Sequence, residues 1–351
     1  MFVFFITAFL AFLITPIVIK FYKKNNWLDD PKKSKHAKKT HLKPVPRGGG
    51  LVIFFSILIA SLLFLQFDKY LIGIIGGALI LTIVGFIDDI YDIHPGWRLI
   101  AGVAAGLMVV GSGIGIAYVS NPLGAGVIHL NQPQLAFELL GKTRTIWILS
   151  DLFALIFILW NINIVNWSKG VDGQMPGFVT IALIFIGLLS YKFIDDPTQF
   201  NTAFLSFIAA GAFAGFLIWN FYPQKIMPGY GAGSLAGYFL AVLAILSGAK
   251  LAATFMVLAI PTADAIFTIV RRILAGKSPL WGDRGHLHHK LLDVYGWGRR
   301  RIAIFYWLAT LGMGFLALYL NTFYKMITMI LVVGLVFTFL IWTKLKTRSP
   351  I

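Results

Sequence analysis

Residues 146–173, "IWILSDLFALIFILWNINIVNWSKGVDG", join a long apolar run to a cluster of polar groups. The run has the composition of a membrane-spanning helix, which needs about 20 mostly apolar residues. The part of the stretch after Trp160 adds asparagines, a lysine, an aspartate and glycines. Amide and charged side chains are costly within a bilayer unless they have partners. The stretch therefore predicts a membrane helix that leads into a polar site.

The composition of the whole chain agrees with a membrane protein. Of its 351 residues, 58% are hydrophobic and only 13% are charged, whereas about 25% would be charged in a soluble domain. The net charge of +16 indicates basic cytoplasmic loops and anionic lipid headgroups rather than nucleic acid. Cysteine is absent, which excludes disulfides and thiolate metal sites. Glu138 is the only glutamate, so carboxylate chemistry falls to the aspartates.

We predict an all-α integral membrane fold in which residues 1–351 form a single domain. The first apolar segment lacks a basic start and a small-residue cleavage site, so it is interpreted as a retained helix rather than a signal peptide. The eleven predicted spans are roughly 1–21, 50–67, 71–87, 99–118, 146–165, 177–193, 202–221, 233–248, 251–270, 302–320 and 326–343.

The orientation follows from the charges of the loops. If the loop 22–49 lies in the cytoplasm, all but six of the thirty Lys and Arg residues fall on or near that side. The N-terminus is then outside, and so is a loop at about 119–145, whose alternating apolar residues predict a small β-hairpin. The polar clusters all reach the cytoplasmic face, which predicts one composite site there. These clusters are 39–50, 85–92, 163–177, 222–234 and 261–289.

Asp88 and Asp89 are the first candidates for chemistry. Adjacent carboxylates at a helix end repel each other unless a cation or strong donors lie between them. Their oxygens suit Mg²⁺ that bridges to phosphate, and a solvated helix end is the alternative. Asp92 lies one turn further along and either supports the pair or caps the helix.

Asn163 and Asn166 share one face of the predicted helix because they are three residues apart. Two interpretations stay open: hydrogen bonds between packed helices, or binding of a metal ion or polar substrate. The sequence "KGVDG" that follows contains glycines, which allow the backbone to approach a ligand closely.

The segment "GDRGHLHH" contains His286, His288 and His289. Zinc is a weak interpretation, because cysteine is absent and Asp283 alone is a poor fourth ligand. Imidazoles that grip phosphate oxygens and a basic loop that binds lipid headgroups are the other interpretations. The basic residues nearby are Arg271, Arg272, Lys277 and Arg284.

Taken in order, these motifs resemble the polyprenyl-phosphate N-acetylhexosamine-1-phosphate transferases, integral membrane enzymes that move a sugar-1-phosphate from a UDP-sugar to an isoprenoid phosphate. The resemblance covers nearly the whole chain, through "KTHLKPVPRGGG", "GFIDD", "NIVN" with "GVDG", and "PTADAIFTIVRRILAGKSPLWGDRGHLHH". The His-Leu-His-His form is similar to the branch that starts O-antigen, teichoic acid and related glycans. The branch that transfers phospho-MurNAc-pentapeptide has three consecutive histidines followed closely by Glu.

The resemblance implies that UMP leaves and a polyprenyl-diphospho-sugar forms, with GlcNAc as the default sugar and Mg²⁺ as cofactor. It implies that Asp88 and Asp89 position or deprotonate the lipid phosphate and bind Mg²⁺ together with Asn166. Catalytic roles also fall to His286 and His288. The residues implied in substrate binding are Lys39, His41, Arg47, Asn163, Lys169, Asp172, Arg272, Lys277, Arg284 and His289.

Two positions depart from the family pattern. Lys169 stands where the family usually has Asp, and Gly231 stands at the Asp of a Gly-Asp-Ala-Gly-Ser motif, which reads "YGAGS" here. We predict that the Lys169 ammonium lies near the diphosphate and supplies charge that a metal supplies elsewhere, so that Mg²⁺ dependence is altered. The alternative is that Lys169 extends to lipid headgroups.

Two other function classes compete with the enzyme: an ion-coupled transporter and a catalytically altered, lipid-binding relative. Transporters keep such polar groups near the bilayer midplane, whereas here they collect at one surface. The predicted partners are a UDP-N-acetylhexosamine, polyprenyl phosphate and membrane lipids, with no nucleic acid. The predicted location is the cytoplasmic (inner) membrane. Homodimer formation, the sugar, the isoprenoid length and the glycan pathway stay open.

Overall fold

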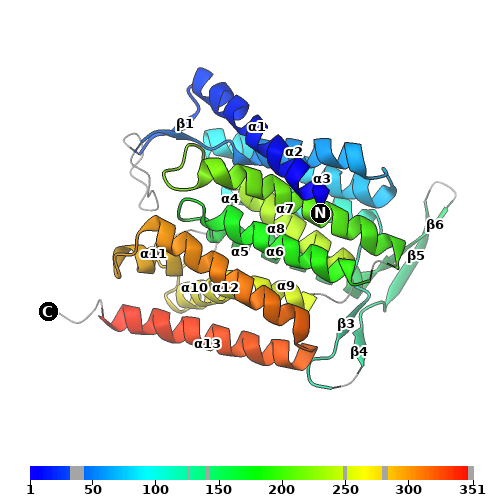
Figure 1. The fold of residues 1–351 in the computed structure, drawn as a ribbon. Helices are drawn as coiled ribbons and strands as arrows, with labels where there is room; N and C mark the ends of the chain where they lie inside the picture. The colour runs from blue at the N-terminus through cyan, green and yellow to red at the C-terminus, as the bar shows by residue number, and fades with distance from the viewer. Residues whose placement is uncertain are drawn as a thin grey trace.

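The computed structural model describes residues 1–31, 43–124, 126–139, 142–193, 195–247, 251–278 and 284–346. These residues form a bundle of long helices with three small two-stranded sheets (Figure 1). The helices are α1 (Phe2–Lys24), α2 (Gly49–Phe64), α3 (Lys69–Tyr91), α4 (Pro95–Gly111), α5 (Ile148–Trp167), α6 (Gln174–Tyr191), α7 (Pro197–Asn220), α8 (Gly229–Leu246), α9 (Leu251–Val257), α10 (Ala259–Leu274), α11 (Leu287–Asp293), α12 (Arg299–Tyr319) and α13 (Thr322–Lys346).

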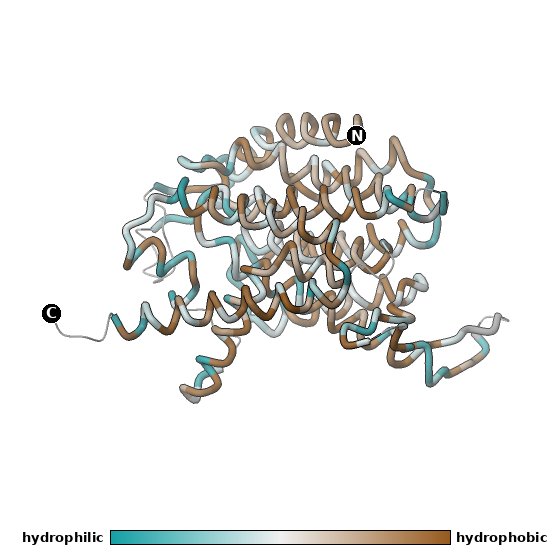
Figure 2. Tube along the Cα trace, turned by 60° about the horizontal axis from the view of Figure 1, so that its bottom comes forward, coloured by the Kyte–Doolittle hydropathy of each residue, from teal (hydrophilic) through white to brown (hydrophobic). Residues whose placement is uncertain are grey.

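The helices confirm the predicted helical membrane protein. Within the described residues, eight helices are long and apolar enough to cross a membrane, and α2 and α4 are shorter apolar helices. Large apolar side chains are exposed on the outer helices, for example Phe5 on α1 and Leu335 on α13. Figure 2 shows the apolar residues along the middle of the bundle and hydrophilic residues near its ends. The outer surface therefore suits contact with lipid tails.

The predicted continuous span 251–270 is wrong in one respect, because α9 and α10 meet at a bend of 82°. Pro261 lies at the third residue of α10. Proline has no N–H to donate to the carbonyl four residues earlier, and its ring clashes with that carbonyl. The carbonyl in question belongs to Val257, where α9 ends, so a straight helix through this point is disfavoured.

Small residues allow the buried helices to approach closely, as is common in membrane bundles. A Cβ at Gly215 of α7 would collide with the backbone of α1 at Ala8. A Cβ at Gly237 of α8 would collide with the backbone of α5 at Asn161. Helix α8 is buried along most of its length, so it is the core element against which α2, α3 and α5 pack.

The strands lie outside the bundle, at its two ends (Figure 1). The region predicted to form one hairpin forms two, because β3 pairs with β4 and β5 pairs with β6, both antiparallel. The short strands β1 and β2 pair at the opposite end of the bundle, beside α1. The bounds are β1 (Leu28–Asp29), β2 (Val45–Pro46), β3 (Tyr118–Ser120), β4 (Val127–His129), β5 (Gln134–Leu139) and β6 (Lys142–Trp147).

Candidate active site

The predicted aspartates lie where α3 ends, at the end of the bundle opposite the hairpins. Asp92 ends that helix in a left-handed conformation (φ 48°, ψ 63°), and its N–H donates to the Asp88 carbonyl at 2.8 Å. Asp92 therefore caps the helix through its backbone, and its side chain shares Arg98 with Asp88. Arg98 of α4 donates from Nε to Asp88 Oδ1 at 2.6 Å and from a terminal nitrogen to Asp92 Oδ1 at 2.7 Å. Asp88, which is only 3% exposed, thus has a cationic partner.

Asp89 faces a different set of donors, the start of α8. Its two carboxylate oxygens accept from the backbone N–H groups of Tyr230 at 2.6 Å and Gly231 at 3.3 Å. A helix N-terminus carries partial positive charge and unpaired N–H groups, so it stabilises a carboxylate. Gly229 has φ +67°, and a Cβ there would collide with the Asp89 carboxylate. Glycine is therefore needed at the point where α8 begins.

Lys169 lies in the turn after α5 and points into this group. Its ammonium donates to Asn166 Oδ1 at 2.8 Å and to the carbonyl of Gly229. The Asn166 amide donates back to Ile162 O at 3.0 Å, which orients its oxygen toward the lysine. Burial lowers the pKa of Lys169, while the Asp89 carboxylate favours the charged form. The predicted alternative, extension to lipid headgroups, is not the conformation in this structure.

The glycine-rich segment before α2 forms the next wall of the site. The N–H of Met227 donates to Pro46 O at 2.8 Å, and the N–H of Gly49 donates to Met227 O at 3.2 Å. These bonds tie the segment to the loop before α8. Arg47 pairs with Asp29 at 3.1 Å and also acts electrostatically on Asp89. The predicted residues Lys39 and His41 lie outside the described residues.

The three histidines form a second, buried cluster at the start of α11. His286 Nδ1 lies 2.9 Å from Asp264 Oδ2, and the N–H of Leu287 donates to Asp264 Oδ1 at 2.8 Å. The rings of His286 and His288 are nearly parallel, with centroids 5.7 Å apart. Burial, with nearby positive charge, lowers the pKa of His289 to about 4 and that of His288 well below its usual value. Both rings are therefore neutral near pH 7.

The exit of α5 joins the two clusters. Gly170, next to Lys169, packs so closely on the His288 ring that a Cβ would collide with it. The Trp167 ring lies near His286, at 6.3 Å between centroids, and under the Arg272 guanidinium at 5.9 Å. The aspartate and histidine motifs, far apart in sequence, thus border one region.

Other predicted residues have different surroundings. Asp172, 2% exposed, accepts from the N–H of Gln224 at 3.2 Å and lies 3.7 Å from Arg299, so it links the α5 turn to the loop before α8 and to α12. Arg284 makes a bidentate pair with Asp293 at 2.7 and 3.1 Å. Lys277 is exposed beyond α10, and the Asn163 amide donates to Leu159 O at 2.8 Å.

The three predicted magnesium ligands, Asp88, Asp89 and Asn166, do lie at one site. However, each already has at least one oxygen engaged by a donor of the protein: Arg98, the start of α8 and Lys169. Among the residues that the structure describes, no group of three or more His, Asp or Glu side chains is arranged to hold a metal ion. In this arrangement, the oxygen atoms of these three residues do not fit a divalent cation held by the protein alone.

The contact residues that were not predicted from the sequence include Arg98, Tyr230 and Asp264. The Tyr230 ring lies near two cations, 5.4 Å from the Arg98 guanidinium and 5.9 Å from the Lys169 ammonium. Asp264 is 1% exposed, and an isolated aspartate in an apolar helix is itself a signal of function. Arg98 is a lone cation just before the predicted span 99–118, and an isolated charge there is also a signal of function.

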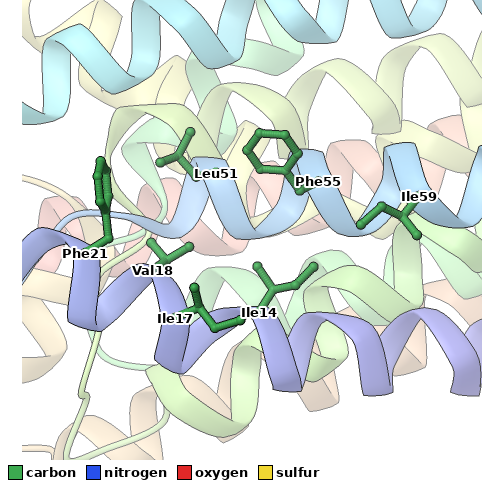
Figure 3. A pocket seen from close by; sticks show the side chains of 7 residues that line it. All are labelled: Ile14, Ile17, Val18, Phe21, Leu51, Phe55 and Ile59. Carbon is green, nitrogen blue, oxygen red and sulfur yellow. The ribbon is translucent and has the colours of Figure 1, made fainter.

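An apolar groove of about 400 Å³ opens beside the site, between α1 and α2 (Figure 3). Val18, toward the Phe21 end of the groove, lies close to Gly48, where a Cβ would be 2.6 Å from Val18 Cγ1. Gly48 follows Arg47 in the chain, so the groove approaches the glycine-rich segment of the site. Its lining residues are Ile14, Ile17, Val18, Phe21, Leu51, Phe55 and Ile59.

Several known proteins are similar to this chain over most of its length. The chain is 27% identical to a Bacillus subtilis (strain 168) protein named a probable undecaprenyl-phosphate N-acetylglucosaminyl 1-phosphate transferase, over 82% of this chain and 76% of that protein. It is 28% identical to a decaprenyl-phosphate N-acetylglucosaminephosphotransferase of Mycolicibacterium smegmatis, covering 78% and 72% of the two chains. A phospho-N-acetylmuramoyl-pentapeptide-transferase of Bacillus velezensis is 27% identical, covering 89% and 94%.

A family model also matches the part of the chain that contains the aspartate pair, the asparagine motif and the start of α8. The model describes glycosyl transferase family 4 and matches residues 71–248, just over half of the chain. On this evidence, the chain belongs to glycosyl transferase family 4.

Proposed function

We propose that this protein transfers N-acetylglucosamine-1-phosphate from UDP-GlcNAc to a polyprenyl phosphate. UMP is released, and the product is a polyprenyl-diphospho-GlcNAc that initiates a cell-envelope glycan. Relatives named as undecaprenyl- and decaprenyl-phosphate transferases support the reaction type. The His-Leu-His-His form supports GlcNAc rather than phospho-MurNAc-pentapeptide as the transferred group.

The observation that carries this proposal is the meeting of carboxylates, cations and imidazoles at one end of a membrane bundle. Asp88 and Asp89 lie beside Arg98 and Lys169, and the histidine cluster adjoins them through Gly170. A reaction between two phosphate anions needs such positive charge and hydrogen-bond donors more than any other catalytic aid. A transporter site near the bilayer midplane would not gather these groups at one end of the bundle.

The chain's own residues supply defined parts of this reaction. An oxygen of the lipid phosphate attacks the phosphorus that bears the sugar, and the bond from that phosphorus to the oxygen of UMP breaks. Arg47 and Lys169 offset the charge of the two anions as they approach, while Asp89 holds the start of α8 in place and Asn166 and Gly229 hold Lys169. Neutral His288 and His289 offer ring nitrogens to phosphate oxygens without the cost of ionising in a buried site.

The topology proposed for the chain has eleven spans, with α9 and α10 together as one broken span. The site then lies at the cytoplasmic face of the cytoplasmic membrane, and the two hairpins lie outside. The support is the distribution of charge, since all but six of the thirty Lys and Arg residues fall on or near the site's side in this topology.

The apolar groove between α1 and α2 is proposed to hold the first isoprene units of the lipid substrate. It runs along α2 from Leu51 to Ile59, which corresponds to about 12 Å of helix at 1.5 Å per residue. Its lining is entirely apolar, and Val18 of the lining lies close to Gly48, the neighbour of Arg47 in the chain. A phosphate at that end would meet a cation while the isoprenoid tail stayed in an apolar environment.

The test is a transfer assay with the purified full-length protein in lipid nanodiscs, radiolabelled UDP-GlcNAc and undecaprenyl phosphate. We expect label in the lipid fraction and one UMP for each sugar transferred. A panel of UDP-sugars in the same assay identifies the preferred donor. Absence of transfer with every UDP-N-acetylhexosamine contradicts the proposal, and uptake of the nucleotide sugar into proteoliposomes without transfer indicates a transporter instead.

A further inference from the structure

The ammonium of Lys169 donates hydrogen bonds to oxygen atoms of two separate elements, and a third element adds a carboxylate that acts on it electrostatically. Asn166 of α5 provides an amide oxygen and Gly229 at the start of α8 provides a backbone carbonyl, both of which accept hydrogen bonds from the lysine. Asp89 of α3 adds a carboxylate that interacts with it electrostatically. Carboxylate, amide and carbonyl oxygens are the ligands that hard divalent cations prefer in proteins. The Lys169 ammonium is therefore surrounded by the kinds of oxygen atom that bind metal ions in other proteins.

The surroundings are shaped around this cation. A Cβ at Gly233 would lie 3.2 Å from Lys169 Nζ and would collide with the Asn166 oxygen, so the absence of a side chain there makes room for both groups. The Tyr230 ring faces the ammonium at 5.9 Å, within the range of a cation–π interaction. Lys225 provides a contrast, because it is exposed at the surface over the Trp219 ring at 4.8 Å.

The second departure from the family pattern, Gly231, also makes the site less suited to a divalent cation. Gly231 has no carboxylate to offer a metal ion, and instead its N–H donates to Asp89 at 3.3 Å. The chain thus has a cation at position 169 and a hydrogen-bond donor at position 231, where acids would attract a divalent ion. Both changes reduce the negative charge that a divalent cation requires.

We infer that the Lys169 ammonium takes the place of a protein-bound divalent cation and neutralises charge on the diphosphate of the donor substrate. This inference rests on the proposed transferase function. Lys169 would then be a catalytic residue in direct contact with the substrate. The enzyme would need much less Mg²⁺ than a transferase whose protein ligands hold the ion.

The first experiment measures the initial transfer rate as a function of free Mg²⁺, starting in EDTA. The proteins compared are the wild type, Lys169→Met, Lys169→Asp and the control Lys225→Met. We expect the wild type and the control to keep most of their rate in EDTA. Lys169→Met should lower kcat by about 10²-fold, the loss typical of one electrostatic group, and Lys169→Asp should become dependent on Mg²⁺. If EDTA abolishes wild-type transfer and the Mg²⁺ curves of all four proteins coincide, the inference is wrong.

The second experiment tests the cation site without catalysis. Binding of Mn²⁺ to each protein in nanodiscs is measured by electron paramagnetic resonance, and thermal unfolding verifies that every variant is folded. We expect no stoichiometric Mn²⁺ binding to the wild type and one bound ion in Lys169→Asp. One tight Mn²⁺ ion in both the wild type and Lys169→Asp overturns the inference. If no UDP-sugar is transferred at any Mg²⁺ concentration, the proposed function fails, and Mn²⁺ binding still decides the role of Lys169.

Discussion

Asp88 and Asp89 are neighbours in the chain, yet they face different donors. Arg98 holds Asp88, whereas the backbone at the start of α8 holds Asp89. The repulsion expected between adjacent carboxylates is therefore relieved by two separate sources of positive charge. At the scale of residues, this division means that the two aspartates can be perturbed independently.

Substitution of Arg98 should mainly affect Asp88. Arg98→Gln leaves the buried Asp88 carboxylate without its cation, which should cost about 1–3 kcal/mol of stability and lower the thermal unfolding midpoint of the protein in detergent. Arg98→Lys should recover only part of the loss, because one ammonium does not bridge two carboxylates as a guanidinium does. An unchanged unfolding midpoint in Arg98→Gln would show that the pair contributes nothing.

Asp264 is a positioning residue, because it acts on the candidate site through His286. Asp264→Asn removes the carboxylate that orients the His286 ring, and we expect kcat for transfer to fall by on the order of 10², as for a misplaced acid–base group. The acid limb of the pH profile of kcat should also move, which a purely structural role would not cause. Asp293→Asn, which affects the Arg284 pair, is the matched control and should leave that limb in place.

At the scale of elements, the site depends on how closely the starts of α2 and α8 approach each other. A Cβ at Gly50 of α2 would lie 2.8 Å from the Cα of Gly231 of α8. The obstructing atom belongs to the backbone, so it cannot move aside as a flexible side chain would. The backbone donors that hold Asp89 belong to this same start of α8.

The substitution Gly50→Ala should therefore push α2 away from α8. We expect a loss of about 1–3 kcal/mol in stability, as for overpacking, together with reduced transfer. Gly334→Ala in α13 is the control, since a Cβ there meets nothing within 4 Å. Equal unfolding midpoints for the two variants would contradict the close approach of the helices.

The groove between α1 and α2 gives a prediction about the lipid substrate alone. Ile59→Trp adds bulk to the wall of the groove (Figure 3), so KM for undecaprenyl phosphate should rise while KM for UDP-GlcNAc stays the same. Leu331→Trp on the exposed face of α13 is the control and should change neither constant. If both variants behave alike, the isoprenoid tail binds elsewhere.

At the scale of the whole molecule, the site and the two hairpins lie at opposite ends of the bundle (Figure 1). The chain contains no cysteine, so single introduced cysteines report the membrane topology without background. Lys225→Cys, at the site end, should react with an impermeant maleimide only from the cytoplasmic side, and Leu123→Cys, in the β3–β4 hairpin, only from outside. The reverse pattern would invert the proposed topology.

Much of the fold could be predicted from the sequence, because a membrane helix is specified locally by about 20 apolar residues. The bend at Leu258 was missed, although Pro261 was present, because hydropathy does not respond to a missing N–H donor. The region 119–145 was predicted to form one hairpin and forms two. Strand pairing depends on partners that the composition of one segment does not specify.

Less of the site could be predicted, because its contacts join distant segments. The resemblance singled out Asp89, Asn166 and Lys169, and the structure places them together. The resemblance did not indicate that Asp172 accepts a hydrogen bond from Gln224 or that Asp264 lies against His286. Such pairings depend on how packed helices are rotated, and residue spacing within one helix does not reveal that rotation.

The sequence by itself determined the class of protein and the clusters of polar residues, because the cost of burying charge in lipid restricts where charged residues occur. Only the tertiary structure decided which groups meet inside the site. Lys169 reaches the Gly229 carbonyl across 60 residues of chain, and this contact depends on α5 and α8 packing side by side. The position of the Lys169 ammonium, between α5 and α8, is therefore a property of the assembled bundle.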